Sequence, residues 1–158
     1  MRSAVFRTEE EKADPGLFWL RPDEEFFAAG ACHVLAGTFL AMYPRAEFSA
    51  WRIRPRTPHG RGGHIVVVRK DLVFDCAGYS RRDAFLEEYV EAMRTVFPDW
   101  TCDFDKLDMD PIGWDFCRTQ NHRHPSQFPH DPIPRAEAFV RRFPSPDDIP
   151  GGALLLGR

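Results

Sequence analysis

Residues 64–75 read HIVVVRKDLVFD and give the strongest β-strand signal in the chain. The stretch contains two apolar runs that are short enough for strands and rich in the β-branched and aromatic residues that strands favour. The charged residues between the two runs, Arg69-Lys70-Asp71, indicate a turn. The stretch therefore predicts an antiparallel hairpin with strands over 64–68 and 72–75.

The length of the hairpin turn decides which side chains share a face. If Lys70 and Asp71 are the two central residues of the turn, His64 and Asp75 lie on the same face, because strand side chains alternate. Their backbones are then diagonal neighbours about 7–8 Å apart, which is within side-chain reach. A turn that differed by one residue would place the two side chains on opposite faces. The predicted pairing of His64 with Asp75 therefore depends on the register.

Three helices are predicted around the hairpin, over residues 24–29, 32–43 and 81–97. The second has apolar residues at spacings of three and four, and it ends before Pro44 because the residue before a proline avoids the helical region. The third is expected to be capped by Ser80. Helices and hairpin together predict an α+β fold, in which the helix that bears the first cysteine packs on a small antiparallel sheet.

The whole chain is expected to form a single domain with three parts. Its 158 residues fit one domain. Residues 1–22 are expected to be a loose leader, residues 23–97 the α+β core, and residues 98–158 a wrap rich in Pro and His. Nine of the fourteen prolines lie between Pro98 and Pro150, so irregular structure is expected to concentrate in the wrap.

Weaker signals occur in three further segments. Residues 51–54 alternate as a possible edge strand, residues 136–143 are expected to form one amphipathic helix, and residues 153–156 are a short apolar segment. Residues 51–70 hold six Arg or Lys and no acid, whereas residues 99–115 hold six Asp and one Lys. Because opposite charges attract, these two patches are expected to contact each other, or one of them to face a charged ligand.

The composition excludes several classes of function. Hydrophobic residues make up 43% and charged residues 28%, as in globular proteins. A net charge of −3 gives no reason to expect a nucleic acid or an anionic membrane as partner. No apolar run approaches the roughly 20 residues that span a bilayer, and the polar start of the chain does not resemble a signal peptide. We therefore expect a soluble cytoplasmic protein with reduced cysteines and no cofactor.

One set of residues has the pattern of a nucleophilic site. Cys32 is predicted at the start of a helix, where free N–H groups lower the pKa of a thiol and can bind an oxyanion. We predict Cys32 as the nucleophile, His64 as the general base and then acid, and Asp75 as the carboxylate that orients the imidazole. His33 adjoins Cys32 but points about 100° away around the helix, so we interpret it as a packed or surface histidine.

The order of these residues resembles that of a known superfamily. The order is a cysteine at a helix start, then a histidine at a strand start, then an aspartate on the next strand. These residues lie in the segments Gly30–Ala36, His64–Val68 and Val73–Asp75. In this order the chain resembles the papain-like and transglutaminase-like cysteine enzymes. The resemblance covers about residues 23–97. It implies a Cys–His–Asp triad on an α+β fold, with thiol protease, amidase, deamidase, transglutaminase or acyltransferase activity on a peptide, protein or small amide.

Two positions depart from the pattern of that superfamily. Papain-type enzymes place a Gln a few residues before the cysteine, where this chain has Phe26 and Phe27. Transglutaminases usually carry a Trp directly after the cysteine, where this chain has His33. The resemblance therefore implies a fold and a triad without specifying a substrate.

A second interpretation treats Cys32 as part of the core. Free cysteine is among the most buried residue types, so the chain could be a non-catalytic binding or accessory domain on the same scaffold. A catalytic Cys32 should open onto a cleft, whereas a core Cys32 should be sealed under Phe26, Phe27 and Phe39.

A third interpretation concerns the loop over residues 117–130. Cys117, His122, His124 and His130 offer thiolate and imidazole ligands that zinc accepts. Their spacing matches no common structural zinc pattern, so no metal is expected there. A loop lying over the active cleft is the alternative, in which His122 or His124 contacts the substrate.

Overall fold

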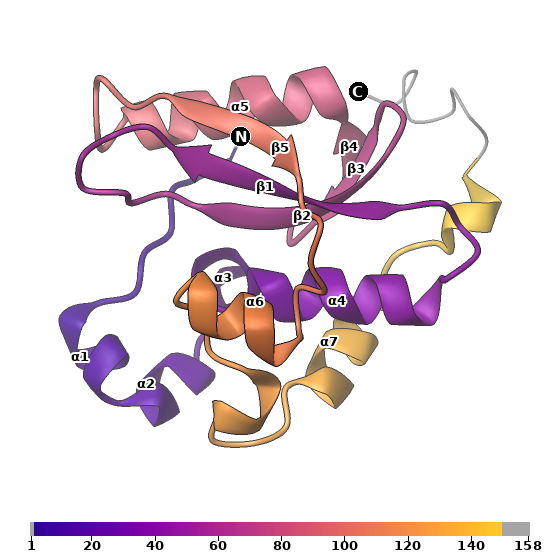
Figure 1. Cartoon of the computed structure of the whole chain (residues 1–158), viewed down its shortest axis with the longest axis horizontal. Coiled ribbons are helices and arrows are strands. Elements are labelled where there is room, and N and C mark those ends of the chain that lie inside the picture. Colours follow the sequence, from indigo (N-terminus) through magenta and orange to yellow (C-terminus); the bar gives the residue numbers. More distant parts are fainter. Residues whose placement is uncertain (1, 150–158) are drawn as a thin grey trace.

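A five-stranded antiparallel sheet with helices on both faces dominates the computed structural model of the protein, which describes residues 2–149 (Figure 1). The helices are α1 (Glu9–Ala13), α2 (Pro15–Trp19), α3 (Asp23–Ala29), α4 (Cys32–Met42), α5 (Arg82–Arg94), α6 (Trp114–Thr119) and α7 (Ile133–Val140), with 3-10 turns η1 (Pro125–Gln127) and η2 (Pro146–Asp148). The strands are β1 (Ser49–Pro55), β2 (His64–Arg69), β3 (Leu72–Asp75), β4 (Gly78–Arg81) and β5 (Cys102–Lys106), in the spatial order β4-β3-β2-β1-β5. The predicted α+β class is confirmed.

Strand β2 explains why the sheet needs helices on both faces. Ile65 and Val67 belong to the core cluster that contains the apolar residues of α4, and Val66 and Val68 belong to the cluster that contains those of α5. All four side chains are buried, so β2 lacks the alternation of apolar and polar residues that is typical of a strand with one exposed face. Figure 1 shows the two layers, with α5 on one face of the sheet and α4 with the other helices on the opposite face.

The hairpin has the predicted register. Val68 lies opposite Val73 and Arg69 opposite Leu72, which leaves Lys70 and Asp71 as the central residues of the turn. Lys70 has a φ of 52°, the left-handed conformation that a tight two-residue hairpin turn requires. His64 and Asp75 consequently share one face of the sheet.

Strand β1 is an inner strand of the sheet, so the prediction of an edge strand over residues 51–54 is wrong. It lies between β2 and β5. The signal for β5 is charge and not hydrophobicity. Arg54 of β1 pairs with Asp105 of β5 at 2.5 Å, and Arg56, directly after β1, forms an ion pair with Asp103 of β5. The predicted attraction between the basic and acidic patches is confirmed, and it brings a strand from the expected irregular wrap into the sheet.

Helix α5 begins later than predicted. Ser80 does not cap it, because Ser80 belongs to β4 and pairs with Val73 of β3. The N-cap is Arg81, and no side chain caps this end. The backbone N–H and C=O groups of the segment after β3 form their hydrogen bonds within the sheet, so Ser80 belongs to a strand and not to the helix.

The leader is more ordered than the expected loose segment. Thr8 and Glu11 form a capping box that starts α1, and Asp14 caps α2. Arg21 holds the leader in place, with Nη2 2.6 Å from Glu11 Oε1 and 3.0 Å from the carbonyl oxygen of Phe6. The helices of the leader are therefore held by polar contacts, whereas helices are predicted in the sequence from the spacing of apolar residues.

The other predicted helices occur with small shifts at their ends. Helices α3 and α4 correspond to the predictions over 24–29 and 32–43, and α7 corresponds to the amphipathic segment 136–143. The apolar segment 153–156 lies outside the described residues. Among residues 2–149, no single helix is long and apolar enough to cross a membrane. Helices α3 and α4 have the required length and apolarity only when taken together, and they are bent by 103° relative to each other.

Phe39 joins α4 to the sheet. It is fully buried, and its ring stacks on Phe74 of β3 with centroids 4.7 Å apart. We expect Phe39→Ala to lower the free energy of unfolding by about 3–5 kcal/mol, because it leaves a cavity between helix and sheet. Leu20→Ala, at a position that is 77% exposed, is the control and should change it by less than about 0.5 kcal/mol. Urea denaturation measures both; equal effects would contradict this account of the packing.

Candidate active site

His64 and Asp75 form a buried hydrogen bond across the hairpin. His64 Nε2 lies 2.9 Å from Asp75 Oδ2, and both side chains are 1% exposed. A carboxylate only accepts, so Nε2 carries a hydrogen and donates it. Nδ1 of His64 is therefore the nitrogen that can take a proton. It is buried and has no hydrogen-bond partner within residues 2–149.

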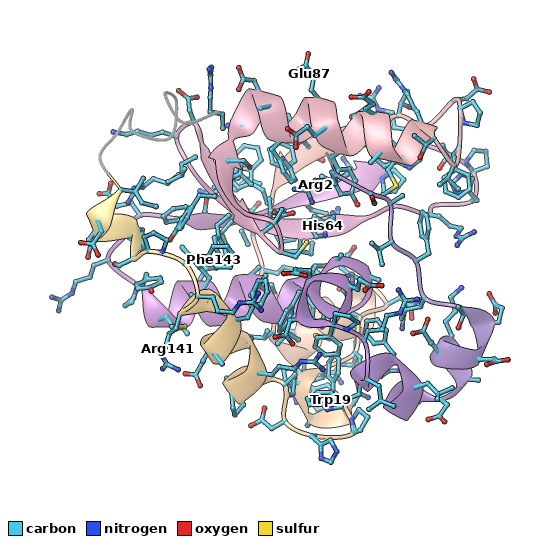
Figure 2. All side chains as sticks on the ribbon, turned by 180° about the vertical axis from the view of Figure 1, so that it is seen from behind. Arg2, Trp19, His64, Glu87, Arg141 and Phe143 are labelled. Carbon is cyan, nitrogen blue, oxygen red and sulfur yellow. The ribbon has the colours of Figure 1, made fainter. Side chains whose placement is uncertain are left out.

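Arg2 is a second partner of Asp75. Its Nη1 lies 2.7 Å from Oδ2 and its Nη2 3.2 Å from Oδ1, a bidentate pair between the leader and β3. The guanidinium also lies over the rings of Phe85 and Tyr89 on α5. Figure 2 shows Arg2 and His64 close together in the layer between α5 and α4. Asp75 is thus held from two sides.

Tyr89 fixes the plane of the imidazole. Its ring stacks on that of His64 at 5.3 Å and 15°, and its hydroxyl donates to the carbonyl oxygen of Gly62 at 2.8 Å. Burial raises the pKa of Tyr89, so the phenol is neutral near pH 7. The ionised neighbours of His64 are therefore Asp75 and Arg2, with Cys32 as a third when its thiol is deprotonated.

Cys32 is the first residue of α4 and lies at the edge of a cavity. No side chain caps this helix end, so its first amide N–H groups are free of a capping oxygen. Cys32 packs in the core cluster with Phe26, Phe27 and Phe39, yet it also lines a cavity of about 470 Å³. With 6% of its surface exposed, it is neither sealed nor freely accessible.

Two further histidines surround the thiol. His33 is fully buried; its Nε2 donates to the carbonyl oxygen of Arg123 at 2.6 Å, and its Nδ1 has no hydrogen-bond partner within residues 2–149. Asn121 adopts a left-handed φ of 54° directly after the end of α6, and His122 follows it. His122 Nδ1 donates to the carbonyl oxygen of Gln120 at 2.8 Å, so its Nε2 remains available. One ligand atom from each of Cys32, His33 and His122 lies within 4.8 Å of the others.

The electrostatics favour a charged pair at Cys32 and His64. Burial opposes ionisation of the Cys32 thiol, but its polar interactions with His122, His33 and His64 outweigh burial and hold its pKa well below the usual value. Burial likewise opposes the charged form of His64, but its interactions with Tyr89, Asp75 and Cys32 outweigh burial and raise its pKa well above the usual value. For Asp75, burial is outweighed by His64 and Arg2, so its pKa is lowered.

The predicted site residues thus fall into two groups. The structure brings Cys32, His64 and Asp75 together, and it places His122 beside the cavity. His124 does not line that cavity; its ring stacks on Trp114 at 3.7 Å, and Nδ1 caps η1. Of the loop residues considered for metal binding, His122 alone belongs to a cluster of possible ligands among the described residues.

Three contributors escaped the sequence analysis. Arg2 contacts a residue 73 positions away, and no local pattern marks it. Tyr89 lies within the helix predicted over residues 81–97, and its stacking on His64 follows only from the packing of α5 on the sheet. His33 points away from Cys32 around the helix. The loop after α6 nevertheless contacts both residues, so His33 lies at the site although it is packed in the core.

The comparisons with known proteins identify no relative. No model of a protein family, no curated protein and no solved structure matches the chain.

The lowered pKa of Cys32 predicts a distinctive pH dependence of its alkylation. Because the thiolate is the nucleophile, iodoacetamide should label Cys32 well below the pKa of an ordinary thiol, about 8.5, and the rate should fall only as the pH drops through the lowered pKa. Peptide mapping measures each cysteine separately. Burial raises the pKa of Cys76, Cys102 and Cys117, so these thiols are internal references that react only at higher pH.

His64→Ala removes the imidazolium and should shift the Cys32 profile to higher pH. An ordinary thiol profile for Cys32 in the unmodified protein would refute the charged pair, as would an unchanged profile in the variant.

Proposed function

We propose that the chain is a cysteine-dependent acyl-transfer enzyme, a hydrolase or deamidase acting on an amide or isopeptide bond, on a papain-like or transglutaminase-like fold. Cys32 is the nucleophile, His64 the base and then the acid, and Asp75 the orienting group. The observation that carries the proposal is that the cavity-lining thiol of Cys32, at a helix start, interacts with His64 of the buried His64–Asp75 pair, whose free nitrogen Nδ1 has no hydrogen-bond partner among residues 2–149. Each of these groups comes from a different segment of the chain.

The first half of the reaction uses the charged pair. The Cys32 thiolate attacks the carbonyl carbon, and the carbonyl electron pair moves to oxygen. The free N–H groups at the start of α4 stabilise that oxyanion. As the tetrahedral intermediate collapses, the C–N bond breaks and His64 Nδ1 gives its proton to the leaving amine or ammonia. A thioester on Cys32 and a neutral His64 remain.

The second half regenerates the thiolate. Neutral His64 takes a proton from water, or from an acceptor amine in a transfer reaction, and the resulting nucleophile attacks the thioester. The C–S bond breaks, and the sulfur leaves as the thiolate beside the imidazolium. Asp75 stays ionised throughout, because Arg2 and His64 both stabilise its negative charge. Its role is to hold Nε2 and thereby direct Nδ1.

The acyl-enzyme can be observed with p-nitrophenyl acetate as a general acyl donor. We expect a burst of nitrophenolate and one acetyl group on Cys32, detected by mass spectrometry. His64→Ala should slow acylation by about 10²–10⁴-fold, because the imidazolium that stabilises the Cys32 thiolate is lost. The control is His59→Ala, which removes an exposed histidine and should leave the burst unchanged. Acylation of another residue, or equal bursts in both variants, would exclude this triad.

A second candidate function, metal binding, is favoured by the cluster of Cys32, His33 and His122. His33 and His122 each donate one ring N–H to a backbone carbonyl, the arrangement that commonly orients histidine ligands. His33 Nδ1 is buried and unpartnered in the described chain, as a ligand atom would be before it binds a metal ion. One thiolate and two imidazoles suit zinc and leave a fourth position open. This function competes with the first, because both use the same sulfur.

Elemental analysis and zinc titration separate the two functions. If zinc binds here, the protein should take up one equivalent, and His122→Ala should weaken affinity by at least tenfold because one of three ligands is lost. His124→Ala is the matched control from the same loop and should bind zinc normally. Absence of zinc uptake, or equal loss in both variants, would exclude the metal site.

A further inference from the structure

The cavity beside Cys32 is lined by positive and neutral polar side chains. Arg7 and Arg123 contribute guanidinium groups, and Asn121 and Gln127 contribute amides. None of its described lining residues is an Asp or a Glu. The chain as a whole carries a net charge of −3, whereas the lining of this cavity has an excess of positive charge.

Both arginines are without an acidic partner in the described part of the chain. Within residues 2–149, neither Arg7 nor Arg123 belongs to an ion pair. Each guanidinium instead lies over a phenylalanine ring, Arg7 at 5.8 Å from the centroid of Phe18 and Arg123 at 5.7 Å from that of Phe128. Stacking of this kind orients the planar guanidinium groups.

The two charges also act on each other. Burial and the charge of Arg7 both lower the pKa of Arg123. The charge of Arg7 also opposes protonation of His122 and so acts to lower its pKa. The three side chains therefore lie close enough to interact. Two half-buried like charges repel each other, and an anion bound between them would be attracted by both.

The packing around Arg7 leaves room for its side chain at the cavity wall. A Cβ atom at Gly30 would lie 2.8 Å from Phe18 and 3.1 Å from Arg7 Cδ, so the absence of a side chain there lets Phe18 and Arg7 approach the start of α4. The carbonyl oxygen of Arg123 accepts the His33 hydrogen bond, which ties the second arginine to the same helix start. Both cations are thus anchored to the segment that carries Cys32.

We propose that Arg7 and Arg123 select an acyl substrate that carries a carboxylate next to the bond that Cys32 attacks. This inference rests on the proposed acyl-transfer function, and it names the substrate class: an acidic amide, either a small molecule or an acidic side chain or terminus of a peptide. Guanidinium groups match a carboxylate through paired N–H donors. Gln127 assists as a donor, because its oxygen already accepts the N–H of His124 and its amide nitrogen remains.

Two alkylating reagents of nearly equal size test the charge preference without any knowledge of the substrate. Iodoacetate carries a carboxylate, and iodoacetamide is neutral. We expect the ratio of their rates at Cys32 to exceed that for a free thiol in the same buffer by roughly tenfold, and to fall as salt screens the arginines. Arg7→Gln and Arg123→Gln should each lower the ratio severalfold. Taking the ratio removes any effect of the variants on the thiolate fraction.

Arg118→Gln is the matched control, because its side chain is 70% exposed and does not line the cavity. A second measurement uses the unmodified protein: glutarate should protect Cys32 from iodoacetamide, and glutaramide, its neutral counterpart, should not. Inorganic phosphate should protect less than glutarate, and stronger protection by phosphate would overturn the carboxylate class.

The outcomes separate this inference from the proposed function. If Cys32 reacts with both reagents at the free-thiol ratio and glutarate does not protect it, the carboxylate site is excluded while the nucleophile stands. If Cys32 reacts with neither reagent, the proposed function fails and the substrate class fails with it. A ratio that falls equally in Arg118→Gln would also overturn the assignment to Arg7 and Arg123.

Discussion

The buried carboxylate of Asp75 is the group on which the site depends. Removing an ionised carboxylate from water is strongly unfavourable unless it is paired and hydrogen-bonded, and Arg2 and His64 together meet that requirement. Arg2 balances the charge of Asp75. The pair formed by Cys32 and His64 is itself neutral overall, both as thiol with imidazole and as thiolate with imidazolium. A proton can therefore move between sulfur and nitrogen without adding net charge to the protein interior. The N-terminal leader, the hairpin and the start of α4 are all needed for this balance.

Cys32 and His64 belong to opposite layers of the fold. Cys32 begins α4, whose apolar residues pack with Ile65 and Val67, whereas His64 stacks on Tyr89 of α5. The thiol and the imidazole meet because both lie at ends of their elements, one at a helix start and the other at a strand start. Their separation is set by the packing of both helices on the same sheet.

The sequence alone was sufficient for the parts of the site that are governed by local rules. Turn length and side-chain alternation placed His64 and Asp75 on one face, and the helix start at Cys32 followed from Gly30 and the spacing of apolar residues. Long-range contacts could not be predicted in the same way. Arg2 acquires its role from a partner on another element. Strand β5 is specified by charge pairs with β1, which a search for hydrophobic periodicity does not detect. His122 lines the cavity and His124 stacks on Trp114, and only the path of the loop after α6 decides which of the two histidines lies at the site.

The hairpin turn has a consequence for how relatives of this chain could be identified. His64 and Asp75 are 11 residues apart, and any change in that interval has to preserve both the register and the shared face of the sheet. The interval between Cys32 and His64 is different, because it includes the exposed loop before β2, where insertions leave the sheet unaltered. Evolution is therefore expected to conserve the interval between His64 and Asp75 and to let the interval between Cys32 and His64 vary in length. A search for distant homologues should weight the two intervals accordingly.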